Sequence, residues 1–296
     1  MAATAAAGAD VTQHDPKVFD QDLDTALLVP AHRLLAICRQ LAPAYERRTT
    51  IPVLGMALIE AGEEGTTFRL TDLDLTIAIV ADDLKCAAPF KACVPFGLLR
   101  QIAGTLDDVV RIGIAPGDTL THRMDQLTIA TDDGFSAAIN LLCPPEDWPT
   151  VSLKDDTPEN WSPISISPGD LRKHIDLARH CISTQETRYY LNGVYLCRHP
   201  VRGTVRSVAT DGHRMAVIDT MTDAPEKLGA IVPRACLQAI TTLISPTGNE
   251  PISLALHKLS PRIRLTAGPI TIDCKLIDGD YPDYTRVIPK EPARTI

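Results

Sequence analysis

The feature that most constrains the fold of this chain is an internal repeat. Four segments begin with proline and continue with apolar residues at three- and four-residue steps, the spacing of an amphipathic helix. They begin at Pro30, Pro95, Pro168 and Pro233, with 65 residues between the members of each pair and 138 residues between the pairs. One unit of about 138 residues therefore occurs twice, and each unit contains two sub-units of 65 residues.

Each sub-unit is predicted to be one helix followed by an antiparallel meander. Proline fits the first turn of a helix, where its missing N–H costs no hydrogen bond. The segments between the helices are short and rich in β-branched residues, as in "TTFRLTD" and "RSVAT", and such runs favour strands. We expect helices over 30–41, 95–106, 168–181 and 233–244.

This pattern predicts an α+β protein with two pseudo-symmetric domains, each with two helices packed on antiparallel sheets. The domains are expected at 25–158 and 159–296, joined by the polar stretch "LKDDTPENWSP". Residues 1–24 are Ala-rich and acidic without periodicity, and we interpret them as a flexible tail.

Charge is distributed unevenly between the predicted helices and the remainder of the chain. The net charge of −8 argues against holding nucleic acid by bulk charge. The helical segments nevertheless carry a net positive charge, from Arg33, Arg39, Arg100, Arg172, Lys173, Arg179 and Arg234 against Asp170 and Asp176. Either the helical surface faces a polyanion, or solvated helix faces simply collect arginine.

Composition excludes several other classes of protein. The eight cysteines form no C-x-x-C pair and several lie in apolar helical segments, so we expect reduced, buried thiols and no metal site. No apolar run is long enough for a membrane helix and no signal-peptide pattern is present, so we expect no membrane contact and a cytoplasmic protein.

The segment "TDGHR" (210–214) could be a small acid–base or metal cluster, but it lies between two strand-like runs and Asp-Gly favours a hairpin turn. The equivalent segment of the first unit, "TDLDL", keeps Thr71 and Asp72 and lacks the His and Arg. We therefore expect a structural turn to which His213 and Arg214 add a binding function. An enzyme that gathers Asp211, His213 and Asp283 remains the alternative.

Three longer segments carry a resemblance to a known family. "RYYLNGVYL" (188–196), "VATDGHRMAV" (208–217) and "LIDGDYPDYTRVIP" (276–289) resemble, in order and separation, motifs of the bacterial DNA polymerase III beta subunit, the sliding clamp, and "TTIPVLG" (49–55) resembles a first-domain segment. The resemblance implies the DNA-clamp fold, in which six such domains form a ring with helices around the hole and sheets outside. It also implies a non-enzymatic processivity factor without cofactor, acting in DNA replication and DNA repair.

The resemblance also assigns residues to two kinds of contact. It implies contacts with double-stranded DNA at Arg48, Gln185, Arg188, Tyr189 and Tyr190, to which helical position adds Arg172, Lys173 and Arg179. The family usually has proline where this chain has Thr49, so we expect a less rigid loop at Arg48. It implies a partner-peptide pocket for short linear motifs of DNA polymerase and clamp-loader subunits, formed by Leu191, Thr210, Gly212, His213, Arg214, Met215, Pro282, Arg286 and Val287.

The chain departs from the family in length, since family members have three domains and this sequence stops about where the third would begin. Three expectations follow. A two-domain chain would close as a homo-oligomer, with a trimer favoured because it restores six domains. A clamp-like adaptor would bind clamp partners as a monomer or dimer without encircling DNA. A truncated chain is the third.

Overall fold

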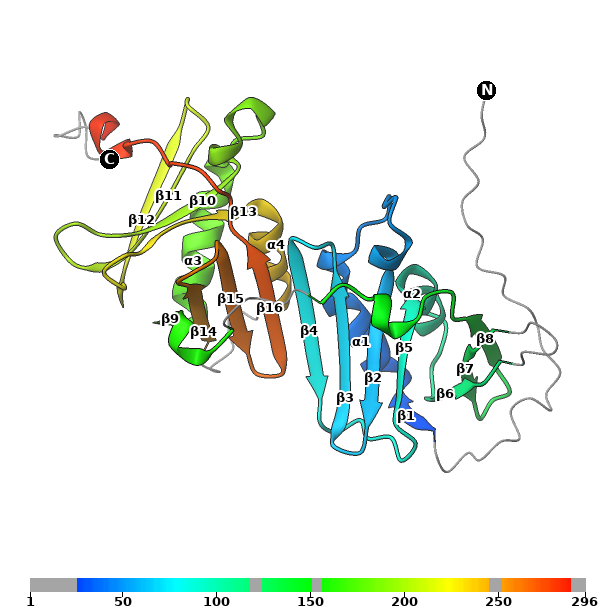
Figure 1. Ribbon diagram of the computed structural model, residues 1–296. Helices are drawn as coiled ribbons and strands as arrows, with labels where there is room; N and C mark the ends of the chain where they lie inside the picture. The colour runs from blue at the N-terminus through cyan, green and yellow to red at the C-terminus, as the bar shows by residue number, and fades with distance from the viewer. Residues whose placement is uncertain (1–25, 118–123, 151–155, 245–251, 289–296) are drawn as a thin grey trace, which may run out of the picture.

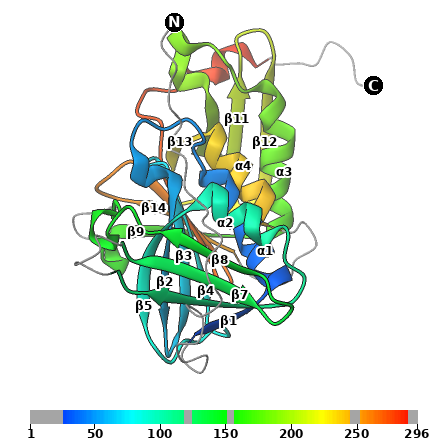
Figure 2. The same ribbon diagram turned by 90° about the vertical axis from the view of Figure 1, so that its right-hand side faces the viewer.

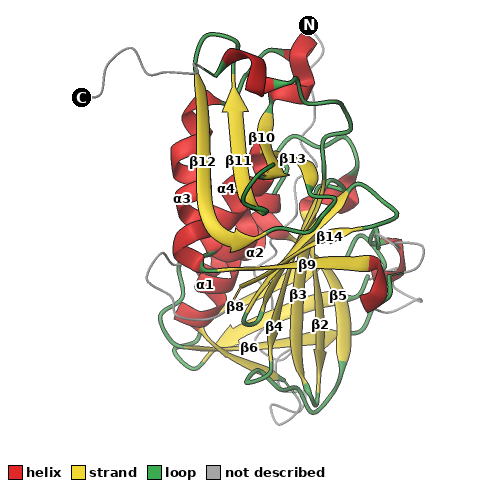
Figure 3. Ribbon diagram, turned by 90° about the vertical axis from the view of Figure 1, so that its left-hand side faces the viewer, coloured by secondary structure: helices red, strands yellow, loops and turns green. Residues whose placement is uncertain are grey.

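The computed structural model describes residues 26–117, 124–150, 156–244 and 252–288, so the predicted tail lies outside the described residues (Figure 1). Four α-helices occur in this described part. In Figures 2 and 3 the helices lie side by side as one layer, and the largest sheet, which has eight strands, lies to one side of this layer. The helices are α1 (Ala31–Leu41), α2 (Phe96–Ala103), α3 (Pro168–Ala178) and α4 (Arg234–Leu243).

The first repeat unit contributes eight strands to two sheets. The sheet orders are β1-β6-β7-β8 and β5-β2-β3-β4. The strands are β1 (Leu27–Pro30), β2 (Met56–Gly62), β3 (Gly65–Thr71), β4 (Leu75–Ala81), β5 (Phe90–Pro95), β6 (Val109–Ala115), β7 (Gln126–Thr131) and β8 (Ser136–Asn140).

The second unit repeats this arrangement with β12-β11-β10-β13 and β16-β15-β14-β9. Its strands are β9 (Trp161–Ile166), β10 (Gly193–Arg198), β11 (Thr204–Thr210), β12 (Met215–Asp223), β13 (Gly229–Pro233), β14 (Ile252–His257), β15 (Arg262–Ala267) and β16 (Ile270–Lys275). Each helix is followed by a three-stranded antiparallel meander, as the sequence predicts, and the expected α+β class is confirmed.

The strand that precedes each helix was not expected from the sequence. These strands, β1, β5, β9 and β13, all lie at sheet edges, and each pairs with the meander of the neighbouring sub-unit. Three of them end in a proline, and β9 has Pro163 in its interior. A proline cannot donate to a strand ladder, so an edge is the position in a sheet that tolerates it.

The predicted helix starts are consequently wrong at three of the four prolines. Pro30, Pro95 and Pro233 are the last residues of strands, and only Pro168 lies in the first turn of a helix. The second helix is also shorter than expected, because the chain tightens into 3₁₀ bonds after Ala103: the Gly104 N–H bonds to the Gln101 carbonyl at 3.1 Å, and the Thr105 N–H bonds to the Ile102 carbonyl at 2.9 Å. The third continues as a 3₁₀ turn over Arg179–Cys181.

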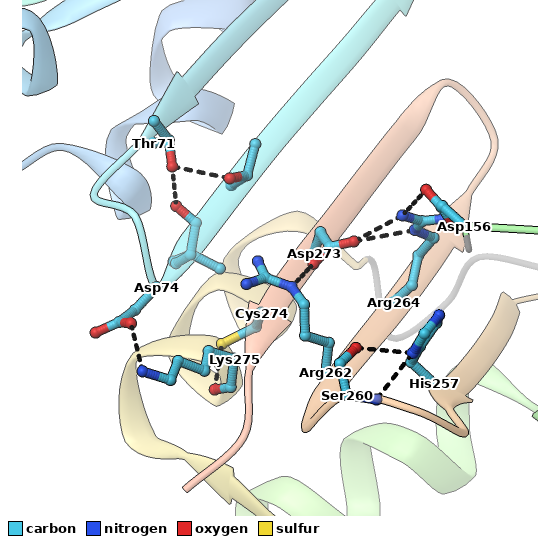
Figure 4. Close-up of polar contacts among 12 residues, drawn as sticks. Thr71, Asp74, Asp156, His257, Ser260, Arg262, Arg264, Asp273, Cys274 and Lys275 are labelled. Atoms are coloured by element: carbon cyan, nitrogen blue, oxygen red, sulfur yellow. Dashed lines mark hydrogen bonds and ion pairs between the residues drawn. The ribbon is translucent and has the colours of Figure 1, made fainter. Parts of the chain in front are cut away.

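The two units meet through β4 and β16, whose antiparallel pairing makes one eight-stranded sheet. On the helix side of this junction, buried Ile77 lies opposite buried Ile272. On the outer side the polar contacts of Figure 4 stabilise β15 and β16, where the Asp273 carboxylate accepts hydrogen bonds from Arg262 at 2.6 Å and Arg264 at 2.9 Å. Arg264 also donates a hydrogen bond to the Asp156 carboxylate at 3.0 Å, which ties the residues shortly before β9 to β15.

Candidate functional site

A cavity of about 520 Å³ lies in the second unit, at the end of β11 and β12. Three segments far apart in the sequence surround it: the 3₁₀ helix η8 (Glu186–Leu191), the β11–β12 turn, and the C-terminal segment that ends in η9 (Tyr284–Val287). Eight of the nine residues that we predicted for a peptide pocket line it, namely Leu191, Thr210, Gly212, His213, Arg214, Met215, Pro282 and Val287. The ninth, Arg286, is exposed on η9 and is absent from the lining.

Four lining residues were missing from the predicted pocket: Arg188 and Tyr190 were predicted as DNA contacts, and the other two are Asp283 and Tyr284. Both belong to the motif "LIDGDYPDYTRVIP", and they follow Pro282 directly. The Asp283 carboxylate accepts a hydrogen bond from the backbone N–H of Thr285 at 3.1 Å and begins η9. The tyrosine hydroxyl lies 3.5 Å from the Cys197 sulfur on β10, and burial raises the pKa of Tyr284. These contacts hold the C-terminal segment against the sheet.

The turn between β11 and β12 is the hairpin that the sequence predicts. The Asp211 carboxylate accepts hydrogen bonds from the backbone N–H groups of His213 at 2.9 Å and Arg214 at 3.0 Å. These backbone bonds, together with the Arg214 side chain, lower the pKa of Asp211 to about 2. Gly212 has φ of +91°, a conformation that favours glycine. The carboxylates of Asp211 and Asp283 are thus both engaged with backbone N–H groups of their own turns. This argues against the alternative in which they act together as an enzyme site.

The character of the cavity follows from its lining. Leu191, Met215, Pro282 and Val287 supply apolar surface, and charged groups from η8 and the turn surround it. The Arg214 guanidinium is held by Asp211 at 2.8 Å and is exposed. Apolar anchoring surface with a few polar groups at its rim is the usual form of a site that binds the apolar end of a peptide.

The predicted DNA contacts on α3 differ in their availability. Lys173 and Arg179 are exposed, and Arg179 lies 3.8 Å from the Asp176 carboxylate. Arg172 is half-buried, with its Nε 2.6 Å from Asp176 and its Nη1 donating to the Thr241 carbonyl of α4 at 2.9 Å. Arg172 therefore ties α3 to α4, which leaves Lys173 on α3 and Arg179 in the 3₁₀ turn after it as the freer cations.

The remaining predicted DNA contacts lie in two places: in or beside η8, and in the loop that precedes β2. The exposed predicted contacts in or beside η8 are Gln185, Arg188 and Tyr189. Two predicted contacts of η8 line the cavity, namely Arg188 and Tyr190. Arg48 is exposed in the loop that precedes β2.

Beside Arg48, the Thr49 hydroxyl accepts the N–H of Ile51 at 3.0 Å and lies 3.1 Å from the Ile51 carbonyl. These contacts order the backbone locally in the loop that we expected to be less rigid.

The described ranges contain neither a metal-binding cluster of side chains nor a membrane-spanning helix. No group of three or more His, Cys, Asp or Glu residues in them could hold a metal ion. None of the helices they contain is both long and apolar enough to span a membrane.

Comparison with known proteins places this fold in one family. The sequence profile described as DNA polymerase III beta subunit, central domain, matches residues 165–283. The beta sliding clamp of Pseudomonas aeruginosa is 34% identical over 262 residues, a match that covers 87% of this chain and 66% of the relative. For the beta sliding clamp of Caulobacter vibrioides the identity is 32% over 279 residues, covering 91% and 70%.

Among solved structures, a DNA polymerase sliding clamp from Caulobacter crescentus superposes with a TM-score of 0.75 at 32% identity, covering 91% of this chain and 70% of that one. This chain spans about two thirds of the length of these relatives. The resemblance seen in the sequence is thereby confirmed: the chain belongs to the beta sliding clamp family.

Proposed function

We propose that this chain is a DNA sliding clamp, a processivity factor that encircles duplex DNA and tethers replicative and repair polymerases through short peptide motifs. The cavity carries the proposal, because three segments separated by up to about 100 residues meet to form one apolar site with a polar rim. The similarity to relatives named beta sliding clamp supports the same role. Such a protein would work in the cytoplasm, where the chromosome lies.

The helices support the DNA-binding part of this proposal. Lys173 on α3 and Arg179 in the 3₁₀ turn that follows it are exposed cations, and the four predicted helical segments carry seven basic residues against two acidic ones. A ring that surrounds DNA needs only weak phosphate contacts to slide, and an acidic exterior does not oppose them. We assign Arg48, Gln185, Arg188, Tyr189 and Tyr190 to the same contact surface, and Arg172 to the support of α3.

The proposal includes the organisation of the chain. We propose that residues 25–158 and 159–296 are two clamp domains that share the eight-stranded sheet, and that chains assemble into a ring. A trimer is the favoured assembly for the 296-residue chain, because three copies of a twofold repeat supply six domains. Polymerase and clamp-loader subunits are the proposed partners of the cavity.

One pair of variants tests the role of the cavity. Val287 lines it and is 68% exposed, so Val287→Asp should leave the fold intact while placing a charge where a peptide would bury apolar surface. We expect the affinity for a labelled polymerase peptide with an apolar end to fall at least about tenfold. Primer extension on a circular template, with polymerase and clamp loader from the same organism, should lose its long products.

The matched control is Val201→Asp, in the turn between β10 and β11, where the side chain is 88% exposed and outside the cavity. It should retain wild-type affinity and long products. Equal peptide affinity of the two variants and the wild type would contradict the assignment of the pocket. Long products from Val287→Asp would contradict tethering through it.

A further inference from the structure

A second cavity lies beside the peptide cavity and has no part in the function proposed above. It has a volume of about 820 Å³, and its lining includes the start of β13, the β14–β15 turn and residues 276–281 of the C-terminal segment. In Figure 1 this segment leaves β16 and runs past β13 towards the C-terminus. Tyr281 lines the second cavity, and the next residue, Pro282, lines the peptide cavity. The two cavities therefore adjoin along the C-terminal segment.

The first unit fills the corresponding place with its own chain. After β8, Trp148 of the sequence "EDWP" is buried in an apolar cluster with Cys93 of β5. After β16, the similar sequence "GDYP" places Tyr281 on β10, where its ring stacks on Tyr195 with 4.7 Å between the ring centroids. Ile231, the counterpart of Cys93 counted from the prolines that end β5 and β13, lines the second cavity. The repeat thus leaves a cavity in the second unit at a place that the first unit fills.

The second cavity exposes part of an unpaired strand edge. β13 pairs with β10 on one side, and on its other side the Ile231 carbonyl accepts the N–H of Ile277 at 3.0 Å. The backbone groups of Ile231 therefore face outward, and those of Gly229 do so too, because alternate residues of a strand face the same way. Gly229 is exposed in the cavity lining, and none of the described strands pairs with it on this side. Such an edge is a template for an extended peptide.

Charge indicates which peptide would fit. Asp278 and Asp280 are exposed on the C-terminal segment, and neither has an ion pair among the described residues. The other charged groups of the lining lie elsewhere: Glu226 and Lys227 are neighbours in the β12–β13 connection, and Lys258 in the β14–β15 turn donates to a backbone carbonyl. A peptide that leaves the peptide cavity along the C-terminal segment therefore meets two unpaired carboxylates first, and basic side chains complement them.

We infer that the second cavity holds the flank of the partner peptide whose apolar end fills the peptide cavity, and that this flank pairs as a short strand with β13 at Gly229. The inference rests on the proposed function and describes its partner further: an extended segment with basic residues next to the apolar end. Because an extended chain advances about 3.3 Å per residue, a flank of five residues reaches roughly 16 Å from the peptide cavity.

Two labelled peptides test the inference by fluorescence anisotropy. The short peptide is the polymerase peptide with an apolar end, and the long peptide adds five residues at its other end, alternating lysine and threonine. The wild type should bind the long peptide at least about fivefold more tightly than the short one. A third peptide, with glutamate in place of each lysine, should show no such gain.

Two double variants locate the gain in affinity. Asp278→Lys with Asp280→Lys reverses both carboxylates of the C-terminal segment, and it should lose the gain while binding the short peptide as the wild type does. The matched control is Glu63→Lys with Glu64→Lys, which makes the same charge change at two exposed positions of the β2–β3 turn. This control should keep the gain.

Hydrogen exchange at Gly229 tests the strand pairing itself. The outward N–H of this residue should exchange at least about tenfold more slowly when the long peptide is bound, and the short peptide should leave its exchange unchanged. Gly229→Pro removes this N–H and should lose the gain in affinity. An added Cβ would lie 3.2 Å from the Tyr195 hydroxyl, so the exchange measurement on the wild type makes the test independent of that variant.

The possible results separate this inference from the proposed function. Equal affinity of the wild type for the short and long peptides would overturn the inference and leave the peptide cavity as proposed. Unchanged exchange at Gly229 with the long peptide bound, or a gain retained by the aspartate variant, would overturn it as well. Failure of the short peptide alone to bind would contradict the proposed function, whereas slowed exchange with the long peptide would still support the second site.

Discussion

The two repeat units hold equivalent helices onto equivalent sheets with different chemistry. In the first unit Ile37 of α1, Phe68 of β3 and Ala81 of β4 are all buried and apolar. Counted from the first residue of each helix and from the β3–β4 and β11–β12 turns, the equivalent positions of the second unit are His174 of α3, Ser207 of β11 and Thr220 of β12, which are also buried. The imidazole lies 2.6 Å from the Ser207 hydroxyl through Nδ1 and 2.9 Å from the Thr220 hydroxyl through Nε2.

This difference teaches that the repeat conserves the arrangement of the elements and not the contacts between them. The apolar set (Ile37, Phe68 and Ala81) stabilises the fold because it removes carbon surface from water, and a polar group without a partner would be destabilising there. The polar set (His174, Ser207 and Thr220) stabilises the fold only while its hydrogen bonds are all made, and in it a neutral imidazole donates one hydrogen bond and accepts another. Substitution and acid should therefore affect the two units differently.

The largest effect is expected where a residue of the polar set replaces its apolar counterpart. Phe68→Ser removes an aromatic side chain from a fully buried position and leaves a hydroxyl without the histidine that the second unit supplies. The cavity and the unpaired hydroxyl should together cost about 4 to 5 kcal/mol of unfolding free energy. Ser207→Ala should cost only about 1 to 3 kcal/mol, because it removes one hydrogen bond with little change of volume. Urea unfolding followed by circular dichroism measures both, and equal losses would contradict the comparison.

The next effect distinguishes the units by pH. Burial lowers the pKa of His174 to about 4 from its ordinary value of 6.5, and Lys173 also lowers it, whereas Asp170 and Asp219 oppose the shift. The unfolded chain therefore takes up a proton before the folded one does as the pH falls. Stability from this group is complete above pH 6.5 and decreases towards pH 4, by about 3 kcal/mol in all.

His174→Gln keeps hydrogen-bonding groups but does not titrate, so its stability relative to the wild type should rise between pH 6.5 and 4. Ile37→Val, at the equivalent position of the first unit, is the control and should follow the wild-type pH dependence. Urea titrations at several pH values give both curves. Parallel curves for wild type and His174→Gln would show that the histidine is not the titrating group.

Local patterns predicted the elements that repeat, because helical spacing and turn residues act over a few positions. The amphipathic helix after Pro168 and the hairpin turn at Asp211 both occur as expected. β1 was not predicted, because four residues that end in proline carry no strand periodicity of their own and are ordered by pairing with β6. The junction of β4 with β16 likewise depends on a partner almost 200 residues away, which no local pattern records.

The lining of the cavity follows the same rule. The residues of the β11–β12 turn that we predicted for the pocket lie together at the cavity because their motif is local. Arg286 and Tyr284 are two positions apart on η9, and a short 3₁₀ turn decides which of them faces the cavity. The sequence contains no periodicity long enough to settle that choice.

The smallest change in unfolding free energy should come from substitutions in the two equivalent hairpin turns, between β3 and β4 and between β11 and β12. Both are closed by an aspartate that accepts backbone N–H groups, Asp72 in the first unit and Asp211 in the second. The next residue has positive φ in both turns: Leu73 with φ of +80° and Gly212 with φ of +91°. A leucine in this region costs about 1 to 2 kcal/mol, whereas glycine adopts it freely.

Exchange of residue types should therefore have opposite signs in the two turns. Leu73→Gly should raise the unfolding free energy by less than about 1 kcal/mol, because the greater entropy of an unfolded glycine offsets part of the relieved strain. Gly212→Ala should lower it by about 1 kcal/mol, since the new Cβ enters a strained conformation and comes within 3.0 Å of Arg188 Nη1. That contact displaces a guanidinium at the cavity, so only Gly212→Ala should also change peptide affinity. Urea unfolding and peptide titration of both variants test this, and changes of the same sign would show that the turns are not equivalent in strain.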